Sequence, residues 1–148
     1  EIVPGIPARA AAAALLGAPL VHDFAVVSLS DLLTPWETIR RRIEAAASAD
    51  FVLVIYNPRS RKRHWQLEEA LRLVRSHRPD RTPVGLVRNA AREGESVLVT
   101  SLADLPVGRV DMLSILIVGN GSTRVLGGRM VTPRGYLAKY GPPSSETP

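Results

Sequence analysis

Three short apolar stretches of this chain lead into asparagines that have small residues beside them. Residues 51–56 run into Asn57, residues 84–88 into Asn89, and residues 112–118 into Gly119 and Asn120. Unbroken apolar runs of this length predict strands that are covered on both faces of a sheet. Helical patterns lie between them. The predicted class is therefore α/β, with a mixed, largely parallel sheet flanked by helices.

The other elements follow from local patterns. Residues 8–16 are rich in Ala and Leu and predict a helix that Gly17 ends. Thr34, Pro35 and Glu37 predict a capping box, with Pro35 at the first position of an amphipathic helix. Further expected elements are a strand stub that ends at Pro4-Gly5, a buried strand over 24–29, a helix over 65–76 and a strand over 96–101.

The size of the chain fits one domain. It has 148 residues, of which 45% are hydrophobic and 22% charged, as in ordinary globular domains. Residues 1–140 are assigned to this domain, and residues 141–148, rich in Pro and Ser, are expected to be disordered. The chain opens on Glu1 rather than Met, and its first residues are typical of a strand entered from upstream. An N-terminal domain is therefore expected to be missing from this chain.

Composition narrows the location and the partners. Without cysteine no disulfide forms, so a cytoplasmic location is expected. The apolar runs are far shorter than the roughly 20 residues that cross a bilayer, so no membrane span is predicted. A net charge of +5 favours an anionic partner: nucleic acid, a phospholipid surface or a polycarboxylate. Two Trp, two Phe and three Tyr leave little material for stacking bases, which weakens nucleic acid as a partner.

The strand ends are the candidate site. Open α/β sheets bind ligands beyond the carboxyl ends of their strands, and small residues there let a ligand approach the backbone. Asn57, Asn89 and Asn120 are therefore expected to share one cleft, although Asn57-Pro58 also fits a plain strand terminator. No dinucleotide-type glycine pattern, metal-ligand cluster or serine nucleophile motif is present, so no metal is expected and no catalytic residue is assigned.

A cationic segment follows the first of these strand ends. It consists of Arg59, Arg61, Lys62, Arg63 and His64. Such a run fits a solvated loop or a nucleic-acid patch. At the ligand-binding end of a strand a set of carboxylate ligands is the alternative, because the guanidinium fork pairs with carboxylates. The residue pattern alone favours the solvated loop.

Four ordered motifs resemble a known family. They are Val3-Pro4-Gly5-Ile6 before an alanine-rich helix, Tyr56-Asn57-Pro58-Arg59-Ser60, residues 83–90 with Arg88-Asn89-Ala90, and Ile117-Val118-Gly119-Asn120. Together with residues 130–136 they look like the C-terminal half of the tetrapyrrole (corrin/porphyrin) methylases. They most resemble the branch that methylates C-17 of a corrin precursor, in its aerobic and its cobalt-containing anaerobic forms alike.

This resemblance implies an enzyme of two α/β domains that holds S-adenosylmethionine between them and releases S-adenosylhomocysteine. The implied reaction is methylation of C-17 of precorrin-3B with ring contraction to precorrin-4, in cobalamin biosynthesis. A homodimer and a tetrapyrrole substrate are implied, without nucleic acid or membrane. A chain that holds only this half is expected to be inactive.

The resemblance also implies cofactor contacts at Pro7, Ala8, Asn57, Asn89, Ala90, Leu113, Ser114 and Ile115. Pro7 and Gly121 depart from the family pattern, in which a hydroxyl residue is typical at both positions. The substrate's carboxylates are expected to pair with Arg59, Arg61, Arg63 and Arg88. The alternative function is a basic nucleic-acid-binding module, which predicts affinity that falls steeply with salt. A fragment that mainly dimerises is a third possibility.

Overall fold

A computed structural model describes residues 1–61, 63–135 and 139 of the chain. Lys62 of the cationic segment, Tyr136 of the last motif and the tail at 141–148 lie outside the described residues. The helices are α1 (Ala8–Leu16), α2 (Trp36–Ser48), α3 (Trp65–Arg75) and the 3₁₀ turn η1 (Val107–Arg109). The strands are β1 (Gly17–Ala18), β2 (Phe24–Ser28), β3 (Val52–Tyr56), β4 (Pro83–Arg88), β5 (Ser96–Ser101), β6 (Ser114–Val118), β7 (Arg124–Leu126) and β8 (Arg129–Val131).

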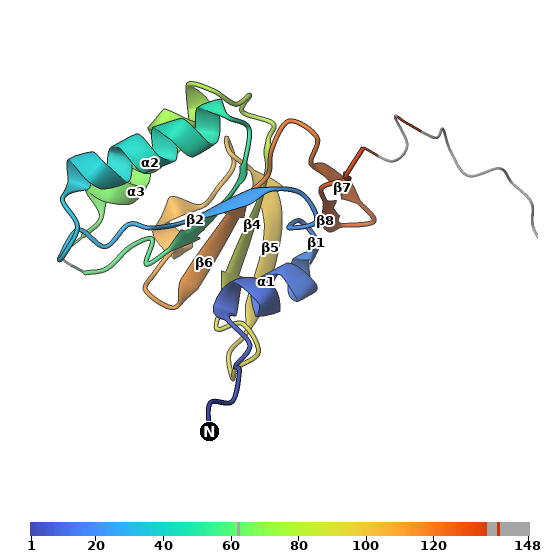
Figure 1. The fold of residues 1–148 in the computed structure, drawn as a ribbon, viewed down its shortest axis with the longest axis horizontal. Helices are drawn as coiled ribbons and strands as arrows, with labels where there is room; N and C mark the ends of the chain where they lie inside the picture. Colours follow the sequence, from blue (N-terminus) through green and yellow to red (C-terminus); the bar gives the residue numbers. More distant parts are fainter. Residues whose placement is uncertain (62, 136–138, 140–148) are drawn as a thin grey trace, which may run out of the picture.

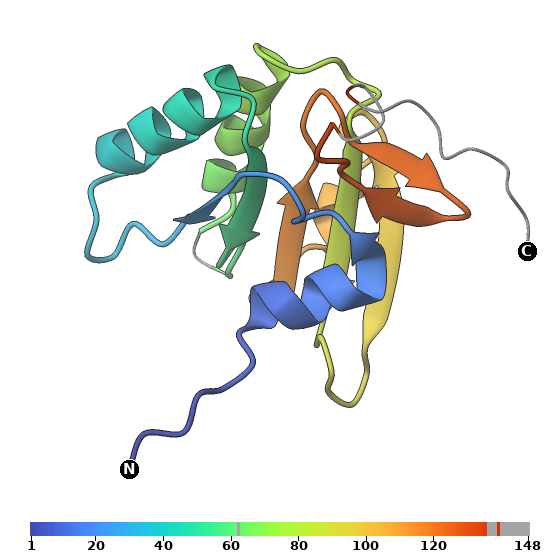
Figure 2. The same cartoon turned by 45° about the vertical axis from the view of Figure 1, so that its right-hand side comes forward.

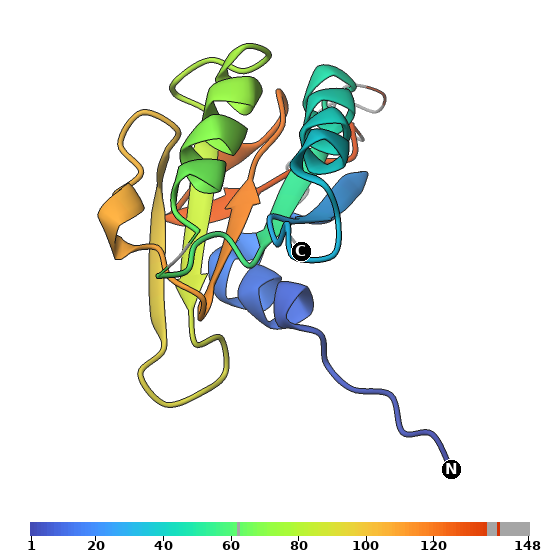
Figure 3. The same cartoon turned by 90° about the vertical axis from the view of Figure 1, so that its left-hand side faces the viewer.

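The main sheet has five strands in the order β2-β3-β6-β4-β5 (Figure 1). The predicted mixed sheet with flanking helices is confirmed, but only the β2–β3 pair is parallel, so the parallel share is smaller than expected. The segment 89–95 between β4 and β5 is too short for a crossover, which forces an antiparallel pair. This connection projects beyond the edge of the sheet (Figure 3). β3 and β4 run in the same direction, with β6 running oppositely between them.

The helices divide between the two faces of this sheet, which gives two apolar layers. On one face α2 and α3 pack against alternate residues of β3, β4 and β6, including Leu53, Leu86 and Leu116. On the other face Ala12 and Leu16 of α1 pack with a second set from these strands. A small sheet, β1-β8-β7, lies beside the end of α1 (Figure 2). Side-chain alternation along the central strands thus supplies both layers.

Helix α1 lies unusually close to the sheet. A Cβ atom at Gly85 of β4 would overlap the side chain of Leu16, which is 1% exposed. The absence of a side chain at Gly85 therefore lets Leu16 seat against the strand. The helix covers the predicted residues and ends at Gly17, whose φ of 125° suits only glycine.

One predicted strand and one predicted helix cap are wrong. Residues 1–7 form no strand, because they pair with no neighbour among the described residues. Helix α2 begins at Trp36 after Pro35, and no side chain caps it. The expected capping box does not form because the carboxylate of Glu37 is held instead by the guanidinium of Arg40, at 3.0 and 2.9 Å.

Two apolar segments are less buried than expected. Strand β2 is an edge strand that pairs only with β3, and its Phe24 and Val26 are 39% and 48% exposed. Helix α1 packs mainly on β4, β5 and β6 and does not shield β2, which leaves these side chains exposed. Met112 and Leu113 precede β6 and do not belong to it. They form a turn in which the backbone N–H of Leu113 donates to the carboxylate of Asp111.

Candidate functional site

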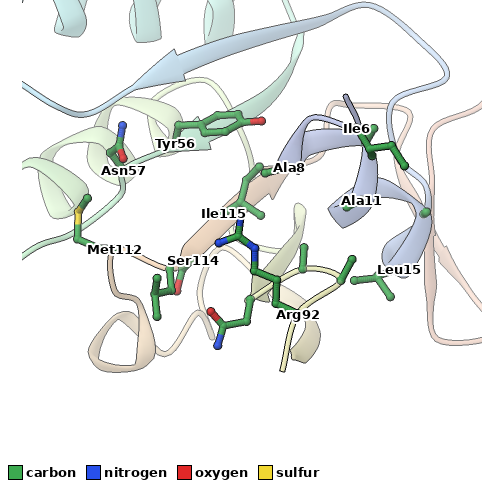
Figure 4. Close-up of a pocket in the computed structure, with 16 residues that line it drawn as sticks. Ile6, Ala8, Ala11, Leu15, Tyr56, Asn57, Arg92, Met112, Ser114 and Ile115 are labelled. Atoms are coloured by element: carbon green, nitrogen blue, oxygen red, sulfur yellow. The ribbon is translucent and has the colours of Figure 1, made fainter. Parts of the chain in front are cut away.

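A pocket of 640 Å³ lies at one edge of the main sheet, between α1 and the strand ends (Figure 4). One wall is the alanine-rich face of α1, with Ala8, Ala11 and Leu15. The remainder comes from the ends of β3 and β4 with the turn after β4, and from Met112 and Leu113 with the first two residues of β6. The volume is within the range of about 300–1,000 Å³ typical of small-molecule sites.

Strand direction explains which segments meet there. Because β6 runs opposite to β3 and β4, the start of β6 lies beside the ends of both neighbours. Asn57 and Asn89 therefore share the pocket, as expected. Asn120 follows the far end of β6 and lies at the opposite edge of the sheet, so the prediction that it joins the same cleft is wrong.

Both pocket asparagines have left-handed backbones. The φ angle is 48° at Asn57 and 51° at Asn89, a region where asparagine is enriched. Asn57 donates from Nδ2 to the hydroxyl of Ser28 at 3.0 Å. The turn after Asn89 also places Ala91 at a φ of 57°, held by a 2.7 Å bond from its N–H to Glu95. Terminating a strand and lining a pocket are thus compatible roles for these residues.

Seven of the eight expected cofactor contacts line this one pocket. They are Ala8, Asn57, Asn89, Ala90, Leu113, Ser114 and Ile115. Pro7 directly precedes α1 and is not among the lining residues. Contact with a cofactor stays a prediction for all eight. Sequence reasoning missed Tyr56, Arg92, Met112 and Ala11. Tyr56 belongs to a recognised motif, and Ala11 shares a helical face with Ala8.

Tyr56 joins the end of β3 to the start of α1. Its hydroxyl oxygen accepts a 2.8 Å hydrogen bond from the backbone N–H of Arg9. The first N–H groups of a helix lack partners within the helix, and no side chain at Pro7 supplies one. Tyr56 therefore satisfies one of these groups and fixes the helix wall relative to the strand.

Asp111 organises the segment that leads into β6. One carboxylate oxygen accepts from the N–H of Leu113 at 3.0 Å and from the hydroxyl of Ser114 at 2.8 Å. The other accepts from Nε of Arg88 at 2.8 Å. Burial alone would raise the pKa of Asp111, but the hydrogen bonds from Arg88, Ser114 and Leu113 outweigh it and lower the pKa.

Three of the four expected carboxylate ligands already have partners within the chain. Arg88 pairs with Asp111, and Arg59 donates to the carbonyl of Val107 at 2.9 Å. Arg63 donates to the carbonyl of Asn57 at 2.6 Å. Arg61 is exposed and has no partner among the described residues.

Arg59 and Arg61 line a second cavity, of 570 Å³, next to the first. The two cavities share Met112 and Leu113. Metal binding has no support in the described part of the chain, where no group of three His, Cys, Asp or Glu residues converges. Over the same residues, no helix is long and apolar enough to cross a membrane.

The fold and the site define an α/β domain with a small-molecule-sized pocket at its strand ends. The family model of the "Tetrapyrrole (Corrin/Porphyrin) Methylases" matches residues 1–106. The chain belongs to the tetrapyrrole methylase family.

The chain is similar to several named proteins of this family. It is 53% identical over 136 residues to a probable cobalt-factor III C(17)-methyltransferase of Salmonella typhimurium, covering 92% of this chain and 56% of the relative. It is 47% identical over 125 residues to a precorrin-3B C(17)-methyltransferase of Sinorhizobium sp, covering 84% and 49%. The crystal structure of the methyltransferase CobJ matches with a TM-score of 0.84 and 38% identity, covering 90% of this chain and 56% of that one. The chain thus spans about half the length of these relatives.

Proposed function

We propose that this chain forms one wall of the S-adenosylmethionine site in an enzyme that methylates C-17 of precorrin-3B, or of its cobalt-containing counterpart. The proposed reaction contracts the ring and belongs to cobalamin biosynthesis. The observation that carries the proposal is the 640 Å³ pocket, which gathers seven residues named independently from the sequence. The names of both relatives support the position of methylation.

The pocket's chemistry fits such a cofactor. The alanines of α1 offer an apolar wall without bulk, which suits the flat face of an adenine ring. Asn57, Asn89 and Ser114 add polar groups opposite that wall. When bound, the cofactor would supply the reactive methyl group through its sulfonium centre.

The chain's own residues would contribute alignment. Tyr56 and Arg63 fix the helix wall and the Asn57 turn through hydrogen bonds of 2.8 and 2.6 Å. Asp111 fixes the turn before β6. Holding reactants in a near-attack geometry accounts for several kcal/mol of many enzymatic barriers, on the order of 7–11 kcal/mol in the best cases.

The neighbouring cavity fits the substrate's side chains. Corrin precursors carry acetate and propionate groups, and Arg61 is free to pair with one of them at the mouth of this cavity. Arg59, tied to Val107 through Nη1, keeps its other nitrogens for the same use. Each partly exposed pair would contribute about 1 kcal/mol or less.

A homodimer is the proposed assembly. Phe24 and Val26 expose apolar surface on the edge strand, and Leu32 and Leu33 in the next loop are 84% and 92% exposed. Apolar patches of this kind mark interaction surfaces. Sedimentation velocity should show a dimer, and a monomer at tens of micromolar protein would contradict this assembly. The cytoplasmic location stays a prediction.

Turnover by the full-length protein that carries this chain tests the function. With S-adenosylmethionine, precorrin-3B or cobalt-factor III should gain one methyl group by mass spectrometry, and Arg61→Ala should raise KM more than it lowers kcat. Methylation of neither substrate by a protein that binds the cofactor would contradict the proposed reaction. Salt-sensitive retention of the chain on DNA, together with failure to bind the cofactor, would favour the nucleic-acid alternative.

A further inference from the structure

A separate pocket of 470 Å³ lies at the opposite edge of the main sheet, where β4 begins. Pro83, the first residue of β4, and Asn120, just after β6, line it. The candidate cofactor pocket lies beyond the other end of β4. The six residues of this strand, at about 3.3 Å each, separate the two pockets by about 20 Å. A ligand in one pocket would therefore not contact a ligand in the other.

Asn120 lines this pocket and has an unused hydrogen-bond donor. Its side chain is buried, with the residue only 6% exposed. Its Oδ1 accepts from the N–H groups of Ser122 and Thr123 at 3.0 and 3.1 Å. A backbone N–H can only donate, so these bonds fix the oxygen toward the turn and the amide nitrogen away from it. Among the described residues that nitrogen has no hydrogen-bond partner.

Thr82 repeats this pattern. It lines the same pocket and is 4% exposed, and within the described chain its hydroxyl has no hydrogen-bond partner either. Neither polar atom is among the fully buried atoms that lack a partner, so both stay accessible from the pocket. Two unpaired donors that line one pocket are available to a polar ligand.

The positive charge of the pocket favours an anionic ligand. Within the described part of the chain, Arg81 and Arg124 are the charged residues that line it. Arg124 is oriented by bonds of 2.9 Å from one nitrogen to the carbonyls of Gly121 and Thr123, which leaves its other nitrogens available. The carboxylate at the pocket's edge, Asp50, accepts from the N–H of Gly121 at 3.0 Å and pairs with Arg78 at 3.3 Å, so its charge is balanced.

We propose that this pocket binds the phosphate group of a small molecule, held by Arg81, Arg124, the Asn120 amide and the Thr82 hydroxyl. Guanidinium groups match the geometry of phosphate oxygens, and neutral N–H and O–H donors complete such sites. The volume leaves room for an organic group beside the phosphate.

Nuclear magnetic resonance can test this site directly, because the chain has only three asparagines, Asn57, Asn89 and Asn120. On titration with inorganic phosphate or with glycerol 3-phosphate, the side-chain amide signal of Asn120 should shift and saturate. The signals of Asn57 and Asn89 should stay in place. If glycerol 3-phosphate binds more tightly than inorganic phosphate, the ligand is a phosphorylated metabolite. If the two bind with equal affinity, the ligand is the free phosphate ion. A shift of Asn120 that never saturates, or that sodium chloride at equal ionic strength reproduces, would overturn the proposal.

Two variants and a control locate the binding. Arg81→Gln removes one exposed charge and should weaken phosphate binding about fivefold. Asn120→Asp keeps the oxygen that accepts from the turn but places a negative charge in the pocket, so binding should be lost while the fold is retained. Arg41→Gln makes the same charge change on α2, away from the pocket, and should have no effect. Equal weakening by Arg41→Gln and Arg81→Gln would show a diffuse charge effect and contradict the site.

Discussion

The guanidinium of Arg63 donates a 2.6 Å hydrogen bond to the carbonyl oxygen of Asn57, and its Nη2 lies 3.5 Å from the sulfur of Met112. Asn57 and Met112 both line the candidate cofactor pocket and lie near each other in Figure 4. Nε of Arg63 is buried without a hydrogen-bond partner, so the side chain has little freedom to turn toward a substrate. Arg63 is therefore a positioning residue for this pocket.

Replacing Arg63 should consequently affect the cofactor more than the substrate. Arg63→Ala leaves the Asn57 carbonyl unpaired, at a cost of about 1–3 kcal/mol. We expect the Kd for S-adenosylhomocysteine to rise about tenfold, with partial recovery in Arg63→Lys. Arg61→Ala, the matched control, should leave this Kd unchanged, as measured by isothermal titration calorimetry. Equal effects of Arg61→Ala and Arg63→Ala would contradict the positioning role.

The contact between Gly85 and Leu16 predicts a stability effect. Gly85→Ala should force Leu16 away from β4 and lower the free energy of unfolding by about 1–3 kcal/mol in urea titrations. Gly108→Ala is the control, because a Cβ there meets nothing within 4 Å. In a Leu16→Ala background the Gly85→Ala change should cost less. An unchanged cost in that background would show that the overlap with Leu16 is not the cause.

Asp111 predicts a pH dependence. Its pKa is lower in the folded protein than its ordinary value of 3.8, so it stabilises the fold above that value. This contribution is lost as the pH falls through the lowered pKa. The gap in unfolding free energy between the wild type and Asp111→Asn should therefore be constant near neutrality and shrink below about pH 4. A gap that stays constant down to about pH 2 would contradict the assignment.

Arg78 is a buried side chain that holds the backbone beside the 470 Å³ pocket. Its guanidinium donates to the carbonyls of Gly119 and Phe51, the latter at 2.7 Å. Burial lowers its pKa, and the nearby Asp50 partly opposes this. Arg78→Met should lower the free energy of unfolding by about 2–4 kcal/mol, because carbonyls are left unpaired. Thermal unfolding measures this loss, and Arg72→Met, which breaks an exposed pair with Glu69, should leave the unfolding curve nearly unchanged.

Local chemistry explains what could be predicted from the sequence. Helix α1 follows from its alanines and Gly17, and the central strands follow from unbroken apolar runs that are covered on both faces. The pocket residues Asn57 and Asn89 could be located because each directly follows such a strand. These features depend on neighbours in the sequence.

Other features depend on partners far along the chain. The opposite direction of β6, which separates Asn120 from the other asparagines, is set by pairing with β3 and β4. The exposure of β2 follows from its place at the edge. The bond from Arg63 to a backbone carbonyl could not be identified from any sequence pattern, and the expected contact of Arg63 with substrate stays a prediction.

The most direct test of the cofactor pocket is a nuclear magnetic resonance titration of the chain with S-adenosylhomocysteine. The side-chain amide signals of Asn57 and Asn89 should shift and saturate while that of Asn120 stays in place. Ala11→Phe places a bulky ring in the pocket and should abolish the shifts. Ala103→Phe, at an exposed position, should preserve them. Shifts confined to Asn120, or binding that survives Ala11→Phe unchanged, would contradict the assignment of this pocket.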